Sequence, residues 1–399
     1  MRSITRPLPK QEYGLSLVEL MIGLTISMIA ILIMQQMVVF FDTQKRGSSG
    51  GADAQNTGMI AMHTLESDIR QAGYGLASLD TLYCTMQTSL PSNGRRLIPI
   101  MIIPDGTART STSNLLGIPP GDAGNDIVAL IYGHTSATPE GVPISGALGS
   151  DTYLFGKNTT GFNNDDWVLA AQEGQPCTLA KVSAVVASPP KITVDYPSTG
   201  ATYAANAANV FNLGSKGMTM RVYAIRNGNL TVCDFWSNDC SADLSGMTSA
   251  AVNALWVPIA SNIVGLRMQY GWDTSATADM RVDTYCRSHL TTASPTCPTP
   301  DGSNTTPATT PNAACDWTRI LALRLALVSR SADKNPEAIN VSDANIKLWP
   351  DQVSDPAAPS PTTTGPSFAI PDRQYRYKVF QSTTPLRNVI WLGAQSSCS

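Results

Sequence analysis

The feature that most constrains this chain is an apolar run near its N-terminus, from Leu15 to Phe41, which holds one formal charge, Glu19. As a helix the run would be about 40 Å long at 1.5 Å per residue, more than the ~30 Å hydrocarbon core of a bilayer. A carboxylate inside such a helix is costly in lipid, so it must either reach the interface or meet a compensating partner. We therefore expect a membrane-length helix whose single charge needs either the membrane interface or a compensating partner.

The residues that flank this run predict its orientation. A short basic leader with Arg2, Arg6 and Lys10 precedes it, and Lys45 and Arg46 follow it. No small-residue cleavage site follows the run, so it differs from a conventional secretory signal, and we expect it to be retained. The basic leader should stay in the cytoplasm, which places the C-terminal bulk outside.

Helical periodicity resumes after a glycine-rich weak point at residues 48–51. Apolar residues then recur at spacings of three and four, which predicts an amphipathic second half of the helix that ends near Gly73 and Gly75. The members of this stripe are Met59, Met62, Leu65, Ile69 and Ala72. We expect the stripe to lie on a sheet.

From residue 76 onward the sequence predicts strands and loops. An Asn227-Gly228 pair between two β-rich runs is a strong hairpin signal. The run from Ile320 to Val328 fits either a central strand or a short helix, and the adjoining Arg330-Ser331 suggests a strand that runs out to the surface. Two Pro- and Thr-rich stretches, 291–314 and 349–372, are expected to be long loops. The other β-rich segments are Asp126–Tyr132, Trp167–Ala171, Leu179–Val186, Lys191–Tyr196, Ile263–Tyr270, Tyr375–Gln381 and Val389–Leu392.

The amino-acid composition limits the classes of function that this chain could have. The chain has 399 residues, of which 43% are hydrophobic and 14% charged, and its net charge of −3 gives no electrostatic support for nucleic-acid binding. All eight cysteines follow the apolar run, which favours disulfides in an oxidising compartment over buried free thiols. The simplest pair is Cys233 with Cys240. The other pairings weighed are Cys286 with Cys315 or Cys297, Cys84 with Cys177, and Cys398 as a tie at the C-terminus.

No catalytic, cofactor or metal site emerges from the sequence. The serines before glycine occupy no nucleophile elbow, and His63, His134 and His289 have no local partner. The oxygen-rich stretches 163–166 and 301–304 could ligate calcium, but neither has the spacing of a calcium loop, so plain polar loops are the preferred interpretation. The aromatic residues Trp236, Trp256, Trp272 and Trp317 are expected to belong to the core rather than to a sugar-binding face.

The basic leader, Gly14, hydrophobic Leu15 and Glu19 together resemble the type III signal of type IV pilins and type II secretion pseudopilins. The resemblance implies that a membrane-embedded prepilin peptidase cuts between Gly14 and Leu15 and methylates the new N-terminus. Leu15 departs from the commonest phenylalanine. The cut creates an α-amine that can neutralise the Glu19 carboxylate, in the same chain or in an adjacent subunit. An unpaired carboxylate in a helical bundle would cost several kcal/mol, so the pairing can select subunits for assembly.

The resemblance extends to PilW-type minor pilins through residues 63–73, 321–331 and 375–391. It implies an α+β type IV pilin fold, in which the long helix packs on an antiparallel β-sheet head with long loop insertions. The expected division is a leader (1–14), a transmembrane and assembly helix (15–75) and a periplasmic head (76–399).

The function that this resemblance implies is structural rather than enzymatic. It is that of a minor pilin that primes a type IV pilus and enters it, near the tip. Such a subunit would sit in the inner membrane and then in the pilus on the cell surface. Its partners would be the major pilin, other minor pilins, the prepilin peptidase and a tip adhesin. The alternatives are a type II secretion minor pseudopilin and a membrane-anchored periplasmic enzyme or carbohydrate-binding protein.

Overall fold

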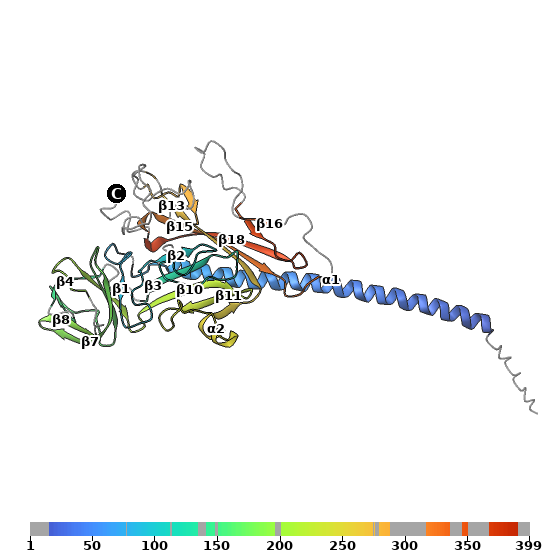
Figure 1. Ribbon diagram of the computed structural model, residues 1–399, viewed down its shortest axis with the longest axis horizontal. Coiled ribbons are helices and arrows are strands. Elements are labelled where there is room, and N and C mark those ends of the chain that lie inside the picture. Colours follow the sequence, from blue (N-terminus) through green and yellow to red (C-terminus); the bar gives the residue numbers. More distant parts are fainter. Residues whose placement is uncertain are drawn as a thin grey trace, which may run out of the picture.

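The longest element is a single helix that projects from a head built of strands (Figure 1). The computed structural model describes residues 16–76, 78–111, 114–134, 141–147, 151–195, 201–273, 275, 279–287, 317–335, 345–349 and 367–389. Helix α1 (Leu17–Gln71) runs without interruption for 55 residues, so the expected weak point at 48–51 is helical. Gly73 and Gly75 follow its end with φ of 78° and 68°, the left-handed region that glycine adopts without strain.

The second half of α1 lies against the head, and the stripe that faces the head differs from the predicted one at its start. Met62, Leu65, Ile69 and Ala72 are buried as predicted, whereas Met59 is 54% exposed. The small residues Ala54, Gly58 and Ala61 take its place on the buried face. Met59 lies six residues before Leu65, about 120° from it around the helix axis, and therefore points away from the buried face.

One sheet of the head has five antiparallel strands in the order β12-β11-β10-β3-β2. The predicted Asn227-Gly228 hairpin is confirmed between β10 and β11, with φ of 53° and 70° at the two turn residues. The core strand β3 is buried along its whole length. The strands of this sheet are β2 (Ile100–Ile103), β3 (Ile127–Gly133), β10 (Met218–Arg226), β11 (Asn229–Asp234) and β12 (Val257–Ala260).

The second sheet has four antiparallel strands in the order β14-β13-β15-β18. The sequence of its central element, β15, is compatible with a strand or a short helix. The structure shows a strand that is buried at nine of its eleven positions. The carboxylate of Asp126, before β3, joins the two sheets by accepting bonds from Met268 N (2.9 Å) and from Arg267 (3.2 Å). The strands are β13 (Ile263–Trp272), β14 (Thr284–Cys286), β15 (Ile320–Arg330) and β18 (Tyr377–Pro385).

A closed barrel of six strands occupies the end of the head away from the start of α1 (Figure 1). Its strands follow the order β7-β6-β9-β4-β5-β8, and pairing of β8 with β7 closes the ring. The whole barrel is inserted between β3 and β10, which pair directly from Gly133 and Met218 onward. The strands are β4 (Val142–Ala147), β5 (Thr152–Phe155), β6 (Trp167–Ala171), β7 (Cys177–Ala187), β8 (Pro190–Asp195) and β9 (Asn209–Gly214).

The barrel has a core of its own but also shares one with the head. Its interior is filled by side chains such as Tyr153, Phe155 and Ile192. On its outer side, Leu169 and Phe211 belong to the same buried cluster as Leu65 and Ile69 of α1. The barrel is thus anchored by apolar packing as well as by its two chain connections.

The expected α+β type IV pilin fold is wrong. The described residues are mostly β, with 38% in strands and 22% in helices, and they include the closed barrel. The barrel was missed because it is closed by pairings between distant strands, such as β4 with β9, which leave no local pattern. The remaining elements are α2 (Ser249–Leu255), β1 (Met86–Gln87), β16 (Asn345–Lys347) and β17 (Ser367–Ala369).

Two disulfides lie within the described residues. Cys84–Cys177 has a Cα–Cα distance of 5.7 Å and joins the segment before β1 to the start of barrel strand β7. Cys233–Cys240 closes a short loop after β11, with a Cα–Cα distance of 5.9 Å. Cys286 is also disulfide-bonded. Its proposed partners Cys315 and Cys297, as well as Cys398, lie outside the described residues.

Candidate assembly site

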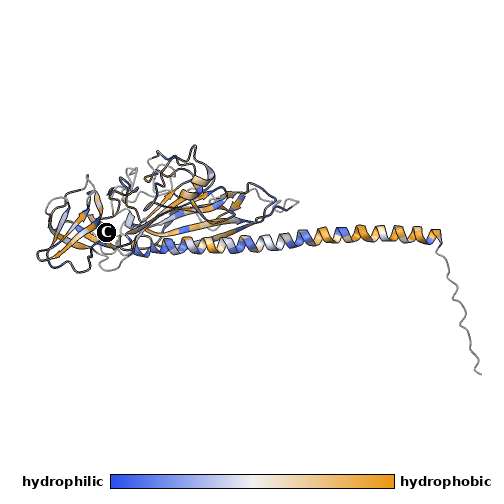
Figure 2. Ribbon diagram, turned by 90° about the horizontal axis from the view of Figure 1, so that it is seen from below, coloured by the Kyte–Doolittle hydropathy of each residue, from blue (hydrophilic) through white to orange (hydrophobic). Residues whose placement is uncertain are grey.

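The first half of α1 is an exposed apolar surface. The stretch Leu17–Asp42 is long and apolar enough to cross a membrane, with a mean hydropathy of 2.4 and no buried residue. Figure 2 shows this half as the most hydrophobic part of the helix and shows that it projects beyond the head. Such a surface is unstable in water, because each Å² of exposed apolar area costs about 25 cal/mol. It is compatible with a membrane anchor or with contact with other apolar helices.

Glu19 lies in the first turn of this exposed helix. Ser16 precedes the helix in an extended conformation, and its carbonyl accepts hydrogen bonds from Glu19 N (3.0 Å) and Leu20 N (3.2 Å). Among the described residues, the Glu19 carboxylate has no hydrogen bond or ion pair. The positive end of the helix dipole favours an acid at this position but does not neutralise it. The expected processing residues Gly14 and Leu15 lie just before, outside the described residues.

Small residues let the head approach the second half of α1 closely. A Cβ added to Gly58 would lie 2.1 Å from Cε2 of Phe380 on β18, so no larger residue fits without a shift. One turn earlier, the Ser329 hydroxyl of β15 donates a 2.8 Å bond to the carbonyl of Ala54. Gly58 therefore serves the packing of α1 on β18, and the Ser329 bond fixes the helix against β15.

A buried carboxylate joins the helix to the five-stranded sheet. Asp68 of α1 is 6% exposed and accepts hydrogen bonds from three side chains. They are Arg221 Nη1 at 3.0 Å, the Tyr132 hydroxyl at 3.2 Å and the Tyr223 hydroxyl. A buried acid is stable only when its partners replace water, and three donors from β3 and β10 do so here.

The charges of this cluster reinforce one another. Burial, and then the Asp68 charge, raise the pKa of both Tyr132 and Tyr223, so each remains a hydrogen-bond donor. Burial acts to lower the pKa of Arg221, but its hydrogen bond to Asp68 and the nearby charges outweigh this and raise it. We call Asp68, Arg221, Tyr132 and Tyr223 the Asp68 cluster; its two tyrosines and its arginine therefore keep their protons across ordinary pH.

Sequence reasoning missed the Asp68 cluster, although a signal was present. Asp68 follows Leu65 by three residues and precedes Ala72 by four, so it lies on the apolar stripe rather than on the polar face. An acid on a buried helical face needs a partner. The partner Arg221 lies on a strand, and no local pattern connects it with the helix.

A third contact closes the C-terminal end of α1. The side-chain amide of Asn388 donates to the carbonyls of Arg70 (3.2 Å), Gln71 (3.3 Å) and Ala72 (3.1 Å). The last carbonyls of a helix have no partner within the helix, so this amide supplies one. The head thus contacts α1 at three places: the small residues of the helix, Asp68 and the C-terminal end of the helix.

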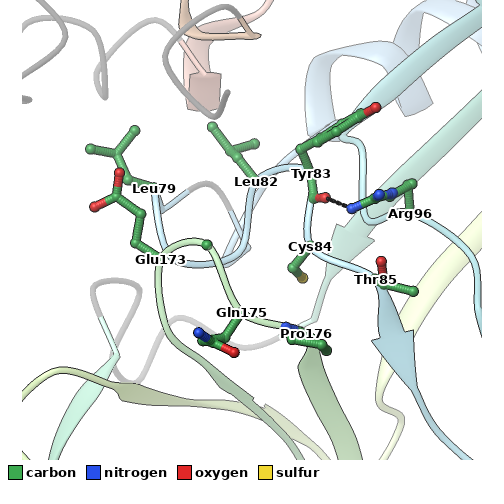
Figure 3. A pocket seen from close by; sticks show the side chains of 10 residues that line it. Leu79, Leu82, Tyr83, Cys84, Thr85, Arg96, Glu173, Gln175 and Pro176 are labelled. Carbon is green, nitrogen blue, oxygen red and sulfur yellow. Dashed lines mark hydrogen bonds between the residues drawn. The ribbon is translucent and has the colours of Figure 1, made fainter. Parts of the chain in front are cut away.

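The described residues contain clefts away from the helix. One of about 500 Å³ lies where the turn Glu173–Pro176 of the barrel meets the segment Leu79–Thr85 (Figure 3). Arg96 lines it and donates a 3.0 Å bond to the carbonyl of Tyr83. The described residues that line this cleft form no catalytic grouping, and they include the disulfide residue Cys84.

The oxygen-rich stretch 163–166 uses its carboxylates within the protein. Asp166 accepts from Asn163 N (2.9 Å) and Asn212 Nδ2 (3.0 Å), and Asp165 pairs with Lys181 at 2.6 Å. Within the described part of the chain, no group of three or more His, Cys, Asp or Glu side chains could hold a metal ion. The other stretch, 301–304, lies outside the described residues.

The described histidines and tryptophans do not form a catalytic or binding group either. His63 is exposed on α1, and exposed His134 contacts the Thr219 hydroxyl at 2.8 Å, while His289 lies outside the described residues. The tryptophans Trp256, Trp272 and Trp317 are buried and Trp236 is partly buried, as predicted for core residues.

Comparison with known proteins gives one match. Residues 222–388 match the family model of PilW, described as Type IV Pilus-assembly protein W. The matched region begins in β10, ends after β18 and includes Tyr223, Phe380 and Asn388, which contact α1. The barrel and α1 lie outside it. Neither a curated protein nor a solved structure matches the chain.

Proposed function

From the PilW region at residues 222–388, which connects this chain with type IV pilus assembly, we propose that the chain is a minor pilin. In this proposal it is a structural subunit that primes the pilus and is built into it near the tip. The observation that carries the proposal is the coincidence of this region with an exposed apolar α1. The PilW region contributes Tyr223, Phe380 and Asn388, which contact the helix, and the helix supplies the surface for assembly.

The proposed mechanism starts with processing. Prepilin peptidase cuts between Gly14 and Leu15, and the new α-amine lies at the start of α1, close to Glu19. The amine of this or of an adjacent subunit neutralises the carboxylate when the apolar helices pack together. A helix without this pairing would carry an uncompensated charge into the bundle, at a cost of several kcal/mol.

The proposed location follows from the helix and the leader. Before assembly, Leu17–Asp42 crosses the inner membrane with the leader in the cytoplasm and the head in the periplasm. After assembly, the head lies on the pilus at the cell surface. The barrel is at the end of the molecule opposite the start of α1, so it would point away from the helical bundle (Figure 1). This placement supports a position near the tip, where an additional module meets no subunit above it.

The partners in this proposal are the prepilin peptidase, the major pilin and other minor pilins, with a tip adhesin as a further one. The test is Glu19→Ala in the full chain. Cleavage should persist, while the subunit disappears from sheared pili. Asp53→Ala is the matched control, because Asp53 is an exposed acid on the polar part of the same helix. Normal recovery of the Glu19→Ala subunit in sheared pili would refute the charge-pairing mechanism.

N-terminal sequencing and gene deletion separate this proposal from its alternatives. A methylated Leu15 supports the pilin class, whereas an intact Met1 would point to a membrane-anchored enzyme or binding protein. If deletion stopped protein secretion but left twitching and pili intact, the chain would be a type II secretion pseudopilin instead.

A further inference from the structure

One flank of the head is exposed, apolar and free of charge. No charged residue occurs between Asp243 and Arg267. Within this stretch α2 has no buried residue, and Met247 (40%), Val257 (49%) and Ile259 (38%) are exposed. Only Leu255 of α2 packs against the core, as a partly buried residue, which is unusual because helices in water are normally stabilised by a wider apolar face packed on a core. We call Met247, α2, Val257 and Ile259 the apolar flank.

The apolar flank is held rigidly rather than loosely. Trp256, between α2 and β12, is fully buried, and the Arg226 guanidinium lies 4.1 Å from the centre of its ring. Arg226 in turn donates to the carbonyls of Pro119 (2.8 Å) and Pro120 (2.9 Å). The exposed residues on both sides of Trp256 are therefore presented by an ordered scaffold, as expected of a preformed contact surface.

The apolar flank adjoins the exposed side of α1. Helix α1 packs against β12, the edge strand of the five-stranded sheet. Ile60 precedes Asp68 by eight residues, which places it about 80° from Asp68 around the helix axis. Since Asp68 faces β3 and β10, Ile60 lies on the flank of α1 nearest this sheet, and it is 64% exposed. Ile60 thus adds one exposed apolar side chain to the side of α1 next to this sheet, where the acid Asp53 is also exposed.

We propose that the apolar flank, together with Ile60, is the docking surface for a second, pilin-type subunit of the same filament. This inference rests on the proposed function, because only an assembly built through α1 brings a neighbour alongside this helix. The absence of charge between Asp243 and Arg267 disfavours lipid headgroups and polyanions and matches the charge-depleted centre of protein interfaces. Pro258 has no N–H to offer an added strand, so the neighbour packs by side chains.

A photocrosslinking experiment on the full chain in cells tests this contact. The photoreactive residue p-benzoylphenylalanine replaces Ile259, and in the matched control it replaces Lys157, an exposed residue of the barrel. The expected result is an adduct from position 259, absent from position 157, whose second chain is identified by mass spectrometry as carrying a prepilin-type N-terminus. No adduct, equal adducts from both positions, or an adduct with lipid or with a protein lacking that N-terminus would overturn the proposal.

A charge-insertion experiment gives a second readout. Val257→Glu with Ile259→Glu places two carboxylates on the exposed flank, and Thr160→Glu with Asn164→Glu adds the same charge to exposed barrel residues. We expect at least about tenfold less subunit in sheared pili for the flank variant, since unpaired charge in an apolar contact is strongly unfavourable. Equal incorporation of both variants would overturn the proposal. Loss with Glu19→Ala but not with the flank variant would leave the proposed function intact and remove only this inference.

Discussion

Asp68→Ala is the most direct test of how the head holds its helix. The substitution removes an acid that is 6% exposed and leaves three donors without their acceptor. Two of these donors, the hydroxyls of Tyr132 and Tyr223, belong to buried side chains. Arg221 differs, because its side chain is 41% exposed and can regain water.

These exposures set the expected magnitude. Removing one partner of a fully buried ion pair costs about 3–5 kcal/mol. Because Arg221 is partly solvated, its share is smaller, and the two buried hydroxyls contribute about 1 kcal/mol or more each. We expect Asp68→Ala to lower the free energy of unfolding by about 2–4 kcal/mol.

The assay is guanidinium unfolding of the full chain in detergent micelles, followed by tryptophan fluorescence. The buried residues Trp256, Trp272 and Trp317 report loss of the head core. The matched control is Glu66→Ala, two residues away on the same helix. Glu66 pairs with Arg70 at 3.2 Å, but that arginine is 63% exposed, so the control should lose no more than about 0.5 kcal/mol.

The comparison of Asp68→Ala with Glu66→Ala decides whether the Asp68 cluster stabilises the packing of α1 on the head. If Asp68→Ala cost no more than Glu66→Ala, the Asp68 cluster would contribute nothing to holding the helix. A double-mutant cycle with Arg221→Ala should also show coupling between the two residues, and strictly additive losses would contradict the ion pair.

Two further predictions concern packing and disulfides. Gly58→Ala should destabilise the head by about 1–3 kcal/mol, because its Cβ would overlap Phe380, whereas Gly51→Ala should stabilise it by up to about 1 kcal/mol, because nothing lies within 4 Å of the added Cβ. Equal effects in the same unfolding assay would contradict the close approach. Replacing Cys84 and Cys177 by serine should cost about 4 kcal/mol and the Cys233–Cys240 pair about 2 kcal/mol, since the two loops span 93 and 7 residues. A larger loss for the short loop would contradict this ranking.

Much of the local structure could be predicted. The apolar run gave the first half of α1, and the Asn227-Gly228 pair gave the hairpin of β10 and β11, because turn chemistry and side-chain periodicity act over a few residues. The short strands of the barrel were harder to predict from the sequence. Strands such as β4 and β5 have six and four residues and carry only weak alternation.

The assembly site was predictable only in its first half. Glu19 was found because a charge in an apolar run stands out without knowledge of the fold. Asp68 was not, because its role depends on side chains more than 60 residues away in sequence, on β3 and β10. The weak point predicted at 48–51 is helical, and Gly58, which the sequence analysis did not single out, is explained by a Phe380 ring far along the chain.

The sequence by itself determined a long helix with an exposed apolar half, the position of Glu19 at its start, and a head rich in strands. These features depend on composition and on spacing within one segment. The tertiary structure alone decided that the barrel closes between β3 and β10, that Asp68 is buried, and that α2 and β12 leave an uncharged apolar flank beside the helix. Each of these depends on which distant segments pack together, a choice made by the collective burial of apolar surface and the satisfaction of buried polar groups.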